Sequence, residues 1–222
     1  MSWELDHLVV AARSLDDGIA WCEATLGFVP QAGGKHPLMG THNRIFAIGS
    51  ARYPRAYFEI IAIDPQAPSP GRARWYDLDD PALQDTISRG PALVHWVAAC
   101  TALGAELDAL RQEGVERGEA IAVERATPTG LLRWHIAVRP DGRRLAAGAL
   151  PTLIEWGDTH PSDTLAACGV ALDGLTLRGL PAAVRTRLPG GVAVAEDVGA
   201  PLTAHLTTPH GPLTLHAPGA PR

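Results

Sequence analysis

Cysteine is scarce in this sequence. Its three cysteines, Cys22, Cys100 and Cys168, are spread over 222 residues. A disulfide framework needs an even set of cysteines and a thiolate zinc site needs clustered ones, so the sequence argues against both kinds of cross-link. We interpret each cysteine as a small buried hydrophobic residue.

Long apolar runs and basic stripes are also missing. No stretch approaches the roughly 20 apolar residues of a membrane-spanning helix, and the N-terminus lacks a basic segment followed by a long apolar one. The 19 Lys and Arg residues are scattered and the formal net charge is −5, so no basic surface is offered to a phosphate backbone. We expect a cytoplasmic protein that binds neither a membrane nor a nucleic acid.

The apolar content, in contrast, is sufficient for a sizeable core. Hydrophobic residues make up 46% of the chain and the mean hydropathy is +0.02. Both values are typical of an ordinary globular protein.

A pattern of one strand, one helix and further strands occurs twice along the chain. The first pass predicts a strand at 5–11, a helix at 14–25 capped by Ser14, a loop at 33–40, and strands at 44–49 and 56–63. The second pass predicts a strand at 92–99, a helix at 100–114, and strands at 119–126, 130–138 and 151–158. Apolar alternation and turn residues carry these assignments, and their repetition indicates two similar modules.

These patterns divide the chain into four parts. We assign residues 1–65 to a first βαβββ module, 66–90 to a connector with a short helical turn at 80–88, 91–160 to a second βαβββ module and 161–222 to a C-terminal partial βαββ module. The last part repeats the pattern weakly and has no histidine in its opening strand. We interpret it as structural and packed on the same domain.

Four polar residues occupy matching places in the two modules. His7 and His95 lie in the middle of the opening strands, and Glu59 and Glu155 lie in the closing strands. A single histidine in an apolar strand is most often a hydrogen-bonded core residue, whereas ionised carboxylates are rarely buried without a cation or donors. Two imidazoles and two carboxylates suit zinc, nickel, manganese, iron or cobalt. The competing interpretation pairs the carboxylates with Arg44 or Arg133 in neighbouring strands and leaves the site free of metal.

Several short segments carry a resemblance to a known family. They are "LDHLVVA" at 5–11, "WCEATLGF" at 21–28, "GTHN" at 40–43, "YFEIIA" at 57–62, "LVHW" at 93–96 and "LIEW" at 153–156. In this order they resemble the vicinal oxygen chelate superfamily, and within it the glyoxalase-like domain proteins, which share a fold with bleomycin resistance proteins and dioxygenases. The resemblance covers residues 3–160 well and the remainder loosely.

The resemblance implies an α+β fold in which paired βαβββ modules form a cupped mixed sheet. It also implies one divalent metal ion held by His7, Glu59, His95 and Glu155. The implied function is that of a metal-dependent lyase or isomerase that chelates vicinal oxygens of a small oxygenated metabolite. Glu155 and Glu59 are the catalytic candidates, and we expect Glu155 to leave the metal and act as general base. Dimers are common among similar proteins, so a homodimer is possible.

Two other functions stay open. An extradiol-type iron dioxygenase would use His7, His95 and Glu155 as a facial triad, with Glu59 off the metal. A resistance-type protein would bind a small molecule in a metal-free cup without turnover.

Substrate contacts are expected from strands and loops around the cup. The candidates are His42, Asn43, Arg133, Trp134 and His160. Alternation places Arg133 and Trp134 on opposite faces of their strand, and the pattern does not decide which face lines the cup. His160 follows Glu155 closely and is a candidate to orient it, although helix capping explains it equally simply.

Overall fold

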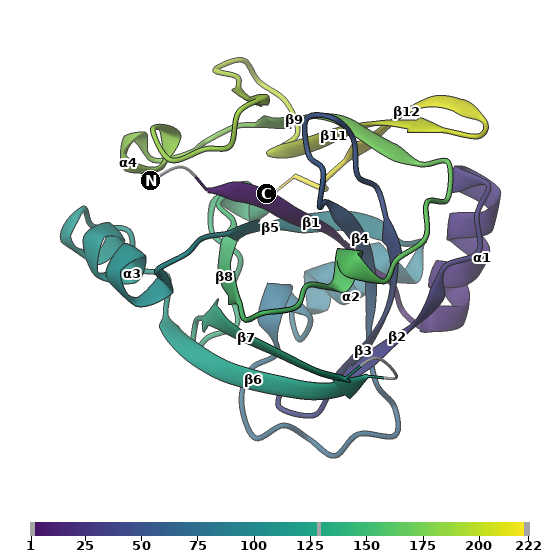
Figure 1. Ribbon diagram of the computed structural model, residues 1–222, viewed down its shortest axis with the longest axis horizontal. Helices are drawn as coiled ribbons and strands as arrows, with labels where there is room; N and C mark the ends of the chain where they lie inside the picture. The colour runs from purple at the N-terminus through teal and green to yellow at the C-terminus, as the bar shows by residue number, and fades with distance from the viewer. Residues whose placement is uncertain (1–2, 128–129, 220–222) are drawn as a thin grey trace.

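Two β-sheets of different size dominate the structure, a computed structural model that describes residues 3–127 and 130–219 (Figure 1). The larger sheet has eight strands in the order β2-β3-β4-β1-β5-β8-β7-β6, and the smaller has four in the order β10-β9-β11-β12. The strands of the larger sheet are β1 (Glu4–Ala11), β2 (Gln31–His36), β3 (Thr41–Ala47), β4 (Tyr57–Ile63), β5 (Ala92–Ala99), β6 (Glu119–Thr127), β7 (Gly130–Val138) and β8 (Thr152–Trp156). Those of the smaller sheet are β9 (Ala171–Leu177), β10 (Val192–Val194), β11 (Leu202–Thr208) and β12 (Gly211–His216).

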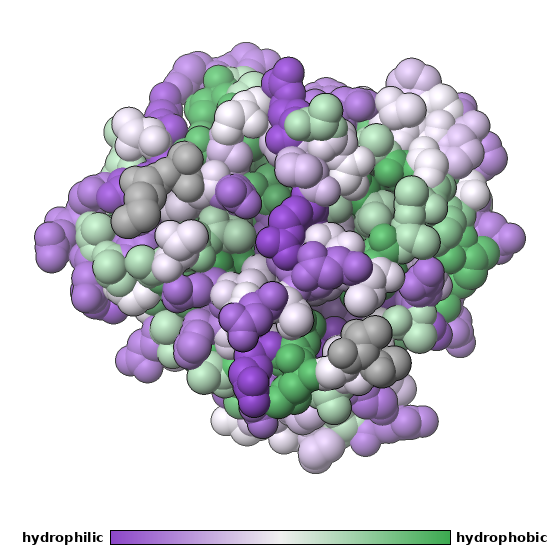
Figure 2. Space-filling model, in the orientation of Figure 1, coloured by the Kyte–Doolittle hydropathy of each residue, from purple (hydrophilic) through white to green (hydrophobic). Residues whose placement is uncertain are grey.

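The helices are short, and each connects two strands that it separates in the sequence. The α-helices are α1 (Leu15–Leu26), α2 (Pro81–Ser88), α3 (Leu103–Gln112) and α4 (Ala182–Arg185), and the 3₁₀ turns are η1 (Trp75–Asp77), η2 (Ala146–Gly148) and η3 (Pro161–Asp163). Among the described residues, none of the helices combines the length and apolar character needed to cross a membrane. Figure 2 shows hydrophilic and hydrophobic residues interspersed over the visible face.

The larger sheet consists of two halves with the same connectivity. In the first half β1 pairs in parallel with β4, and in the second half β5 pairs in parallel with β8. β1 and β5 pair antiparallel and join the halves in the middle of one curved sheet. The predicted α+β class with paired βαβββ modules is therefore confirmed.

Helix α1 follows its local sequence signals closely. The Ser14 side chain accepts a hydrogen bond from the backbone N–H of Asp17, and Gly27 ends the helix in the left-handed conformation at φ 71°. Cys22 and Leu26 are fully buried on the face that contacts the sheet. The cap and the end of this helix agree with the prediction.

Strand β2 corrects the expected loop at 33–40. Its glycines permit an unusually close approach to β3: a Cβ on Gly33 would lie 2.2 Å from Oδ1 of Asn43. The backbone N–H of Gly34 donates to the same oxygen at 2.7 Å. The strand lacks apolar alternation because it is an exposed edge strand, so its composition resembles that of a turn.

The smaller sheet covers the convex side of the larger one. In Figure 1 it lies over β1 and β5, with α1 and α3 at opposite flanks. Leu8 and Trp96 of the central strands belong to the same apolar cluster as Leu175 and Leu206 of the smaller sheet, and all four are almost completely buried. The C-terminal residues thus complete the main hydrophobic core.

The connector between β4 and β5 fills much of the concave side. Its buried apolar residues are Trp75, Tyr76, Leu78, Leu83 and Ile87, which pack in a second apolar cluster with residues of the sheet such as Val9, Val97 and Trp134. The expected helical turn at 80–88 is present as α2, with Asp80 as its N-cap. The cup is therefore largely occupied by the chain itself.

Candidate functional site

A β-bulge in β1 turns two adjacent polar residues into the protein interior. The pairing with β5 shifts between Leu5 and His7, which leaves Asp6 without a register partner. Asp6 is 2% exposed and His7 is 4% exposed. Their side chains meet directly, since Nδ1 of His7 lies 2.6 Å from Oδ1 of Asp6.

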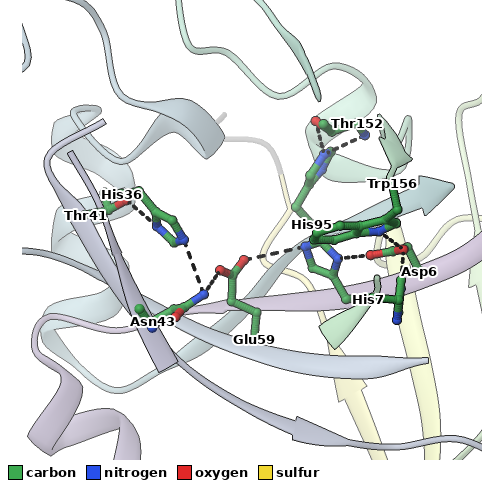
Figure 3. Close-up of polar contacts among 11 residues, drawn as sticks. Asp6, His7, His36, Thr41, Asn43, Glu59, His95, Thr152 and Trp156 are labelled. Carbon is green, nitrogen blue, oxygen red and sulfur yellow. Dashed lines mark hydrogen bonds and ion pairs between the residues drawn. The ribbon is translucent and has the colours of Figure 1, made fainter. Parts of the chain in front are cut away.

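His7 connects Asp6 to a second carboxylate across the cup (Figure 3). Its Nε2 lies 3.6 Å from Oε2 of Glu59, and Oε1 of Glu59 accepts a hydrogen bond from Nδ2 of Asn43 at 2.6 Å. Asn43 Nδ2 also lies 3.4 Å from Nε2 of His36, whose Nδ1 is 3.1 Å from Oγ1 of Thr41. These groups form one continuous buried polar network.

The protonation states of the side chains in this network follow from their contacts. Burial alone would lower the pKa of His7, but the hydrogen bonds with Asp6 and Glu59 outweigh it and raise the pKa to about 9. Burial would likewise raise the pKa of Asp6 and Glu59, but hydrogen bonds from the neighbouring imidazoles and from Asn43 hold both below their ordinary values. At neutral pH His7 is an imidazolium between two carboxylates.

Asp6 is held by donors on its other oxygen. Oδ2 accepts from Nε1 of Trp156 at 2.7 Å and from Nε2 of His160 at 3.0 Å. Nδ1 of His160 accepts from the backbone N–H of Ser162, so His160 also caps η3. His160 therefore positions Asp6 rather than a metal ligand.

Two adjoining cavities lie on the concave side of the sheet. One of about 40 Å³ is lined by His7, Glu59 and Asn43 together with tyrosine and tryptophan rings. The other, of about 280 Å³, is mainly apolar and lies between β6, β7 and the turn after β2. Arg125 lines both cavities, and among the described residues it forms no salt bridge.

His95 lies on the cup side of β5 but faces a different partner. Its Nε2 accepts a hydrogen bond from the backbone N–H of Thr152 at 3.0 Å, and its Nδ1 therefore carries the proton and donates to the carbonyl of Gly148 at 3.2 Å. Burial holds its pKa well below the ordinary value. Both ring nitrogens of this neutral imidazole are already satisfied.

Glu155 lies on the opposite face of the sheet from His7 and Glu59. Its neighbours Ile154 and Trp156 line the small cavity, whereas its own Oε2 accepts the backbone N–H of Leu103 at 3.1 Å, where α3 begins. Alternation along β8 makes this placement unavoidable.

The strand register explains why the sequence alignment of the two modules failed at Glu155. Glu59 is the register partner of Val9, two residues after His7. The partner of Val97, two residues after His95, is Thr152. Thr152 thus occupies in the second half the position that Glu59 occupies in the first. The predicted equivalent, Glu155, lies three residues further along β8.

The expected meeting of His7, Glu59, His95 and Glu155 around one ion therefore does not occur. Within residues 3–127 and 130–219, no three His, Cys, Asp or Glu side chains are grouped so that they could hold a metal ion. The lone pair of His95 is engaged by Thr152, and Glu155 faces away. Neither the four-ligand site nor the iron triad of His7, His95 and Glu155 fits this arrangement.

The five expected pocket residues divide into two groups. Asn43 and Trp134 line the small cavity. His42 lies 4.0 Å from Asp64 and the exposed Arg133 lies 3.5 Å from Glu124, and neither lines the cavity. His160 contacts Asp6, on the side of Asp6 that faces away from His7. Trp134 rather than Arg133 faces the cup.

Several site residues are not found by the sequence analysis. Alternation places Asp6 on the far face, and only the bulge returns it to His7. His36 belongs to the segment predicted as a loop, and Arg125 lies among other charges on an exposed strand. The one available signal is the closeness of Asp6 to His7 in an otherwise apolar run.

Comparison with known proteins places the chain in a family. Residues 5–189 match the family model described as a glyoxalase-like domain. The chain belongs to the glyoxalase-like domain family. The resemblance to the vicinal oxygen chelate superfamily is thereby confirmed, and no curated protein matches this glyoxalase-like protein.

Solved structures with some similarity to this chain include a hypothetical protein and two methylmalonyl-CoA epimerases. A hypothetical protein from Staphylococcus aureus is 14% identical, with a TM-score of 0.58 over 96% of this chain and 86% of that one. Methylmalonyl-CoA epimerase from Mycobacterium tuberculosis is 18% identical, with a TM-score of 0.39 over 69% and 86%. A variant of Streptomyces coelicolor methylmalonyl-CoA epimerase, in complex with 2-nitronate-propionyl-CoA, is 16% identical, with a TM-score of 0.44 over 72% and 99%. Of these three, only the Staphylococcus aureus protein has a TM-score above 0.5, and at 14% identity its likeness concerns the fold alone.

Proposed function

We propose that this glyoxalase-like protein is a lyase or isomerase that moves a proton on a small oxygenated metabolite bound in the cup. Glu59 accepts the proton and His7 stabilises the oxygen that gains charge. The proposal is carried by one observation: an imidazolium and a carboxylate, 3.6 Å apart and almost fully buried, line a cavity that adjoins a larger apolar one. Because the four expected metal ligands do not converge, the proposal includes no step on a metal.

The ion pair supplies both partners of a proton transfer in the required state. Glu59 is ionised at neutral pH and takes a proton from a carbon next to a carbonyl group, while the electron pair moves onto the carbonyl oxygen. His7 donates a hydrogen bond to that oxygen and stabilises the enolate. Return of the proton from Glu59 to the former carbonyl carbon, with the neighbouring hydroxyl proton moving to the enolate oxygen, gives the isomer. Expulsion of a group next to the enolate with its bonding electron pair gives the lyase product.

The cavities indicate the shape of the substrate. The space of about 40 Å³ next to His7 and Glu59 admits only the reacting end of a molecule. The apolar space of about 280 Å³ accepts a short hydrocarbon part, and Arg125 between them suits a carboxylate. We therefore assign the substrate to small oxygenated acids with an apolar body.

Deuterium exchange tests this proposal without knowledge of the product. The protein is incubated in D₂O with a panel of 2-oxo and 2-hydroxy acids, and loss of the C–H signal is followed by NMR. We expect Glu59→Gln to slow exchange by about 10²-fold or more, because the base is removed. Glu155→Gln is the matched control and should exchange at the wild-type rate. Equal rates for Glu59→Gln and the wild type would show that Glu59 is not the base.

A binding function without turnover is the second candidate. It is favoured by the fact that Asp6, His7, Glu59 and Asn43 already satisfy one another, so the network is stable without a reacting ligand. Saturable binding of an acid from the same panel to the wild type, with no exchange of its C–H protons, would identify this function.

A further inference from the structure

The second half of the cup contains a buried arginine that lacks a carboxylate partner. Arg117 is 5% exposed, and its Nη2 donates to the carbonyl of Pro151. Its Nε and Nη1 are buried and have no hydrogen-bond partner among the described residues. A buried guanidinium in this state is costly unless an anion or other acceptor completes it.

Three more arginines surround the same cavity. Arg139, Arg143 and Arg144 line it together with Arg117, His95 and Thr152, and its enclosed volume is about 20 Å³. This volume is sufficient for one oxygen atom or water molecule. Arg143 is exposed, so a larger anionic group can extend from the cavity towards solvent.

The local acidic residues neutralise only part of this charge. Asp141 pairs with Arg139 at 2.6 Å, and Asp77 pairs with Arg144 at 2.9 Å. Glu116 is half exposed and pairs with Arg111 at 3.1 Å. Its charge also acts on Arg117, but it forms no salt bridge with it among the described residues. Arg117 and Arg143 therefore remain without a carboxylate partner among the residues that the structure describes.

The walls of the cavity are held in place. Tyr76 and Asp77 adopt left-handed backbone conformations at φ 60° and 59°, which are strained for residues other than glycine. Arg144 fixes this turn through both its backbone N–H and its Nε, which donate to the Asp77 carboxylate. Its Nη1 donates to the carbonyl of Val94 at 2.9 Å. The cavity is thus preformed rather than created by a ligand.

We propose that this cavity is a binding site for a phosphate group, one oxygen of which enters and accepts a hydrogen bond from an unpaired N–H of Arg117. Arg143 contacts the remaining oxygens at the mouth. A planar guanidinium presents neighbouring N–H groups that match phosphate oxygens, and two uncompensated arginines match its double charge. The source is either free phosphate or the phosphate ester of a metabolite. The proposal does not depend on the proton transfer at His7 and Glu59.

Thermal unfolding with defined anions tests the site. Inorganic phosphate and glycerol phosphate are added separately, with sodium chloride at equal ionic strength as the reference. We expect a rise in Tm of about 2–4 °C at concentrations a few times the Kd, because a ligand of the folded state alone stabilises it. A rise with both compounds identifies the phosphate group as sufficient, and a rise with glycerol phosphate alone identifies a phosphate ester.

Variants decide whether Arg117 is responsible. Arg117→Met retains the length of the side chain and should lose the phosphate-dependent rise in Tm, whereas Arg89→Ala, which replaces an exposed arginine next to α2, should keep it. If Arg117→Met does not fold, Arg143→Ala decides instead, and a smaller rise supports the site. The proposal is overturned if neither compound stabilises the wild type beyond sodium chloride, or if the folded Arg117→Met or Arg143→Ala keeps the full rise.

Discussion

At the scale of single residues, His7 links stability to pH. Its pKa in the folded protein is about 9 because two carboxylates hold its proton, whereas an exposed histidine titrates near 6.5. His36 shows the opposite shift, since burial lowers its pKa to about 4. Two histidines on strands of one sheet thus titrate on opposite sides of neutrality.

These shifts predict a pH dependence with a defined sign. The raised pKa of His7 stabilises the fold fully below about pH 6.5, and this contribution is lost as the pH rises through 9, which amounts to about 3 kcal/mol. The lowered pKa values of Asp6 and Glu59 have the opposite effect, so their contribution is lost in acid. The neutral buried His36 and His95 add stability as the pH rises through about 6.5, so the test lies above that range. Urea unfolding at pH 7.5 and 9 should show a falling free energy of unfolding.

Histidine C–H signals in NMR provide the direct check. His7 should titrate near pH 9, and His36 should remain neutral until about pH 4. A His7 signal that titrates near 6.5 would contradict the ion-pair arrangement.

At the scale of elements, the sequence predicted the succession of strands and helices along the chain and the repetition of the module, but not the strand register. Apolar alternation and caps located β1, α1 and β5 because these signals are local. Register depends on bulges and on pairing partners far along the chain, such as Val97 with Thr152. Glu155 was therefore assigned to the site although a shift of three residues places it on the other face.

The register makes a prediction about metal binding. Thr152→Glu should place a carboxylate at the position equivalent to Glu59, so that two carboxylates and His7 lie on the same side of the sheet, while His95 keeps its bond to the backbone N–H of position 152. Without metal the variant should be less stable than the wild type, because a buried carboxylate is added. Zinc or nickel should then raise its Tm by several degrees and leave the wild type within about 1 °C.

A chelator provides the control for this prediction. EDTA should reverse the gain in Thr152→Glu and leave the Tm of the wild type unchanged. A wild-type protein that loses stability with EDTA, and whose metal binding disappears in Glu155→Gln, would contradict the register described above.

At the scale of the whole molecule, the smaller sheet and the larger one share a single core. Leu175 of β9 and Leu8 of β1 are 1% and 0% exposed in the same cluster. All six tryptophans lie before residue 161, so tryptophan fluorescence reports on the larger sheet and its connector. Fluorescence can therefore show whether the two sheets unfold cooperatively.

We expect Leu175→Ala to shift the fluorescence-detected unfolding transition as strongly as Leu8→Ala does. Each substitution removes a buried side chain and should cost about 2–5 kcal/mol. Urea unfolding followed by fluorescence and by far-UV circular dichroism should give coincident transitions. A fluorescence transition that Leu175→Ala leaves unmoved would show that the C-terminal residues unfold independently.

The connector that packs into the cup has a consequence for ligand choice. Trp75 of η1 lines the cavity next to His7 and Glu59, the larger apolar cavity and the cavity next to Arg117. Tyr76 lies between the cavity next to His7 and the one next to Arg117. The dimensions of each chamber are therefore set by a segment outside the repeated strands. Substitutions in this segment alone can change which molecules the cavities bind, while the sheet and the pair of His7 and Glu59 stay the same.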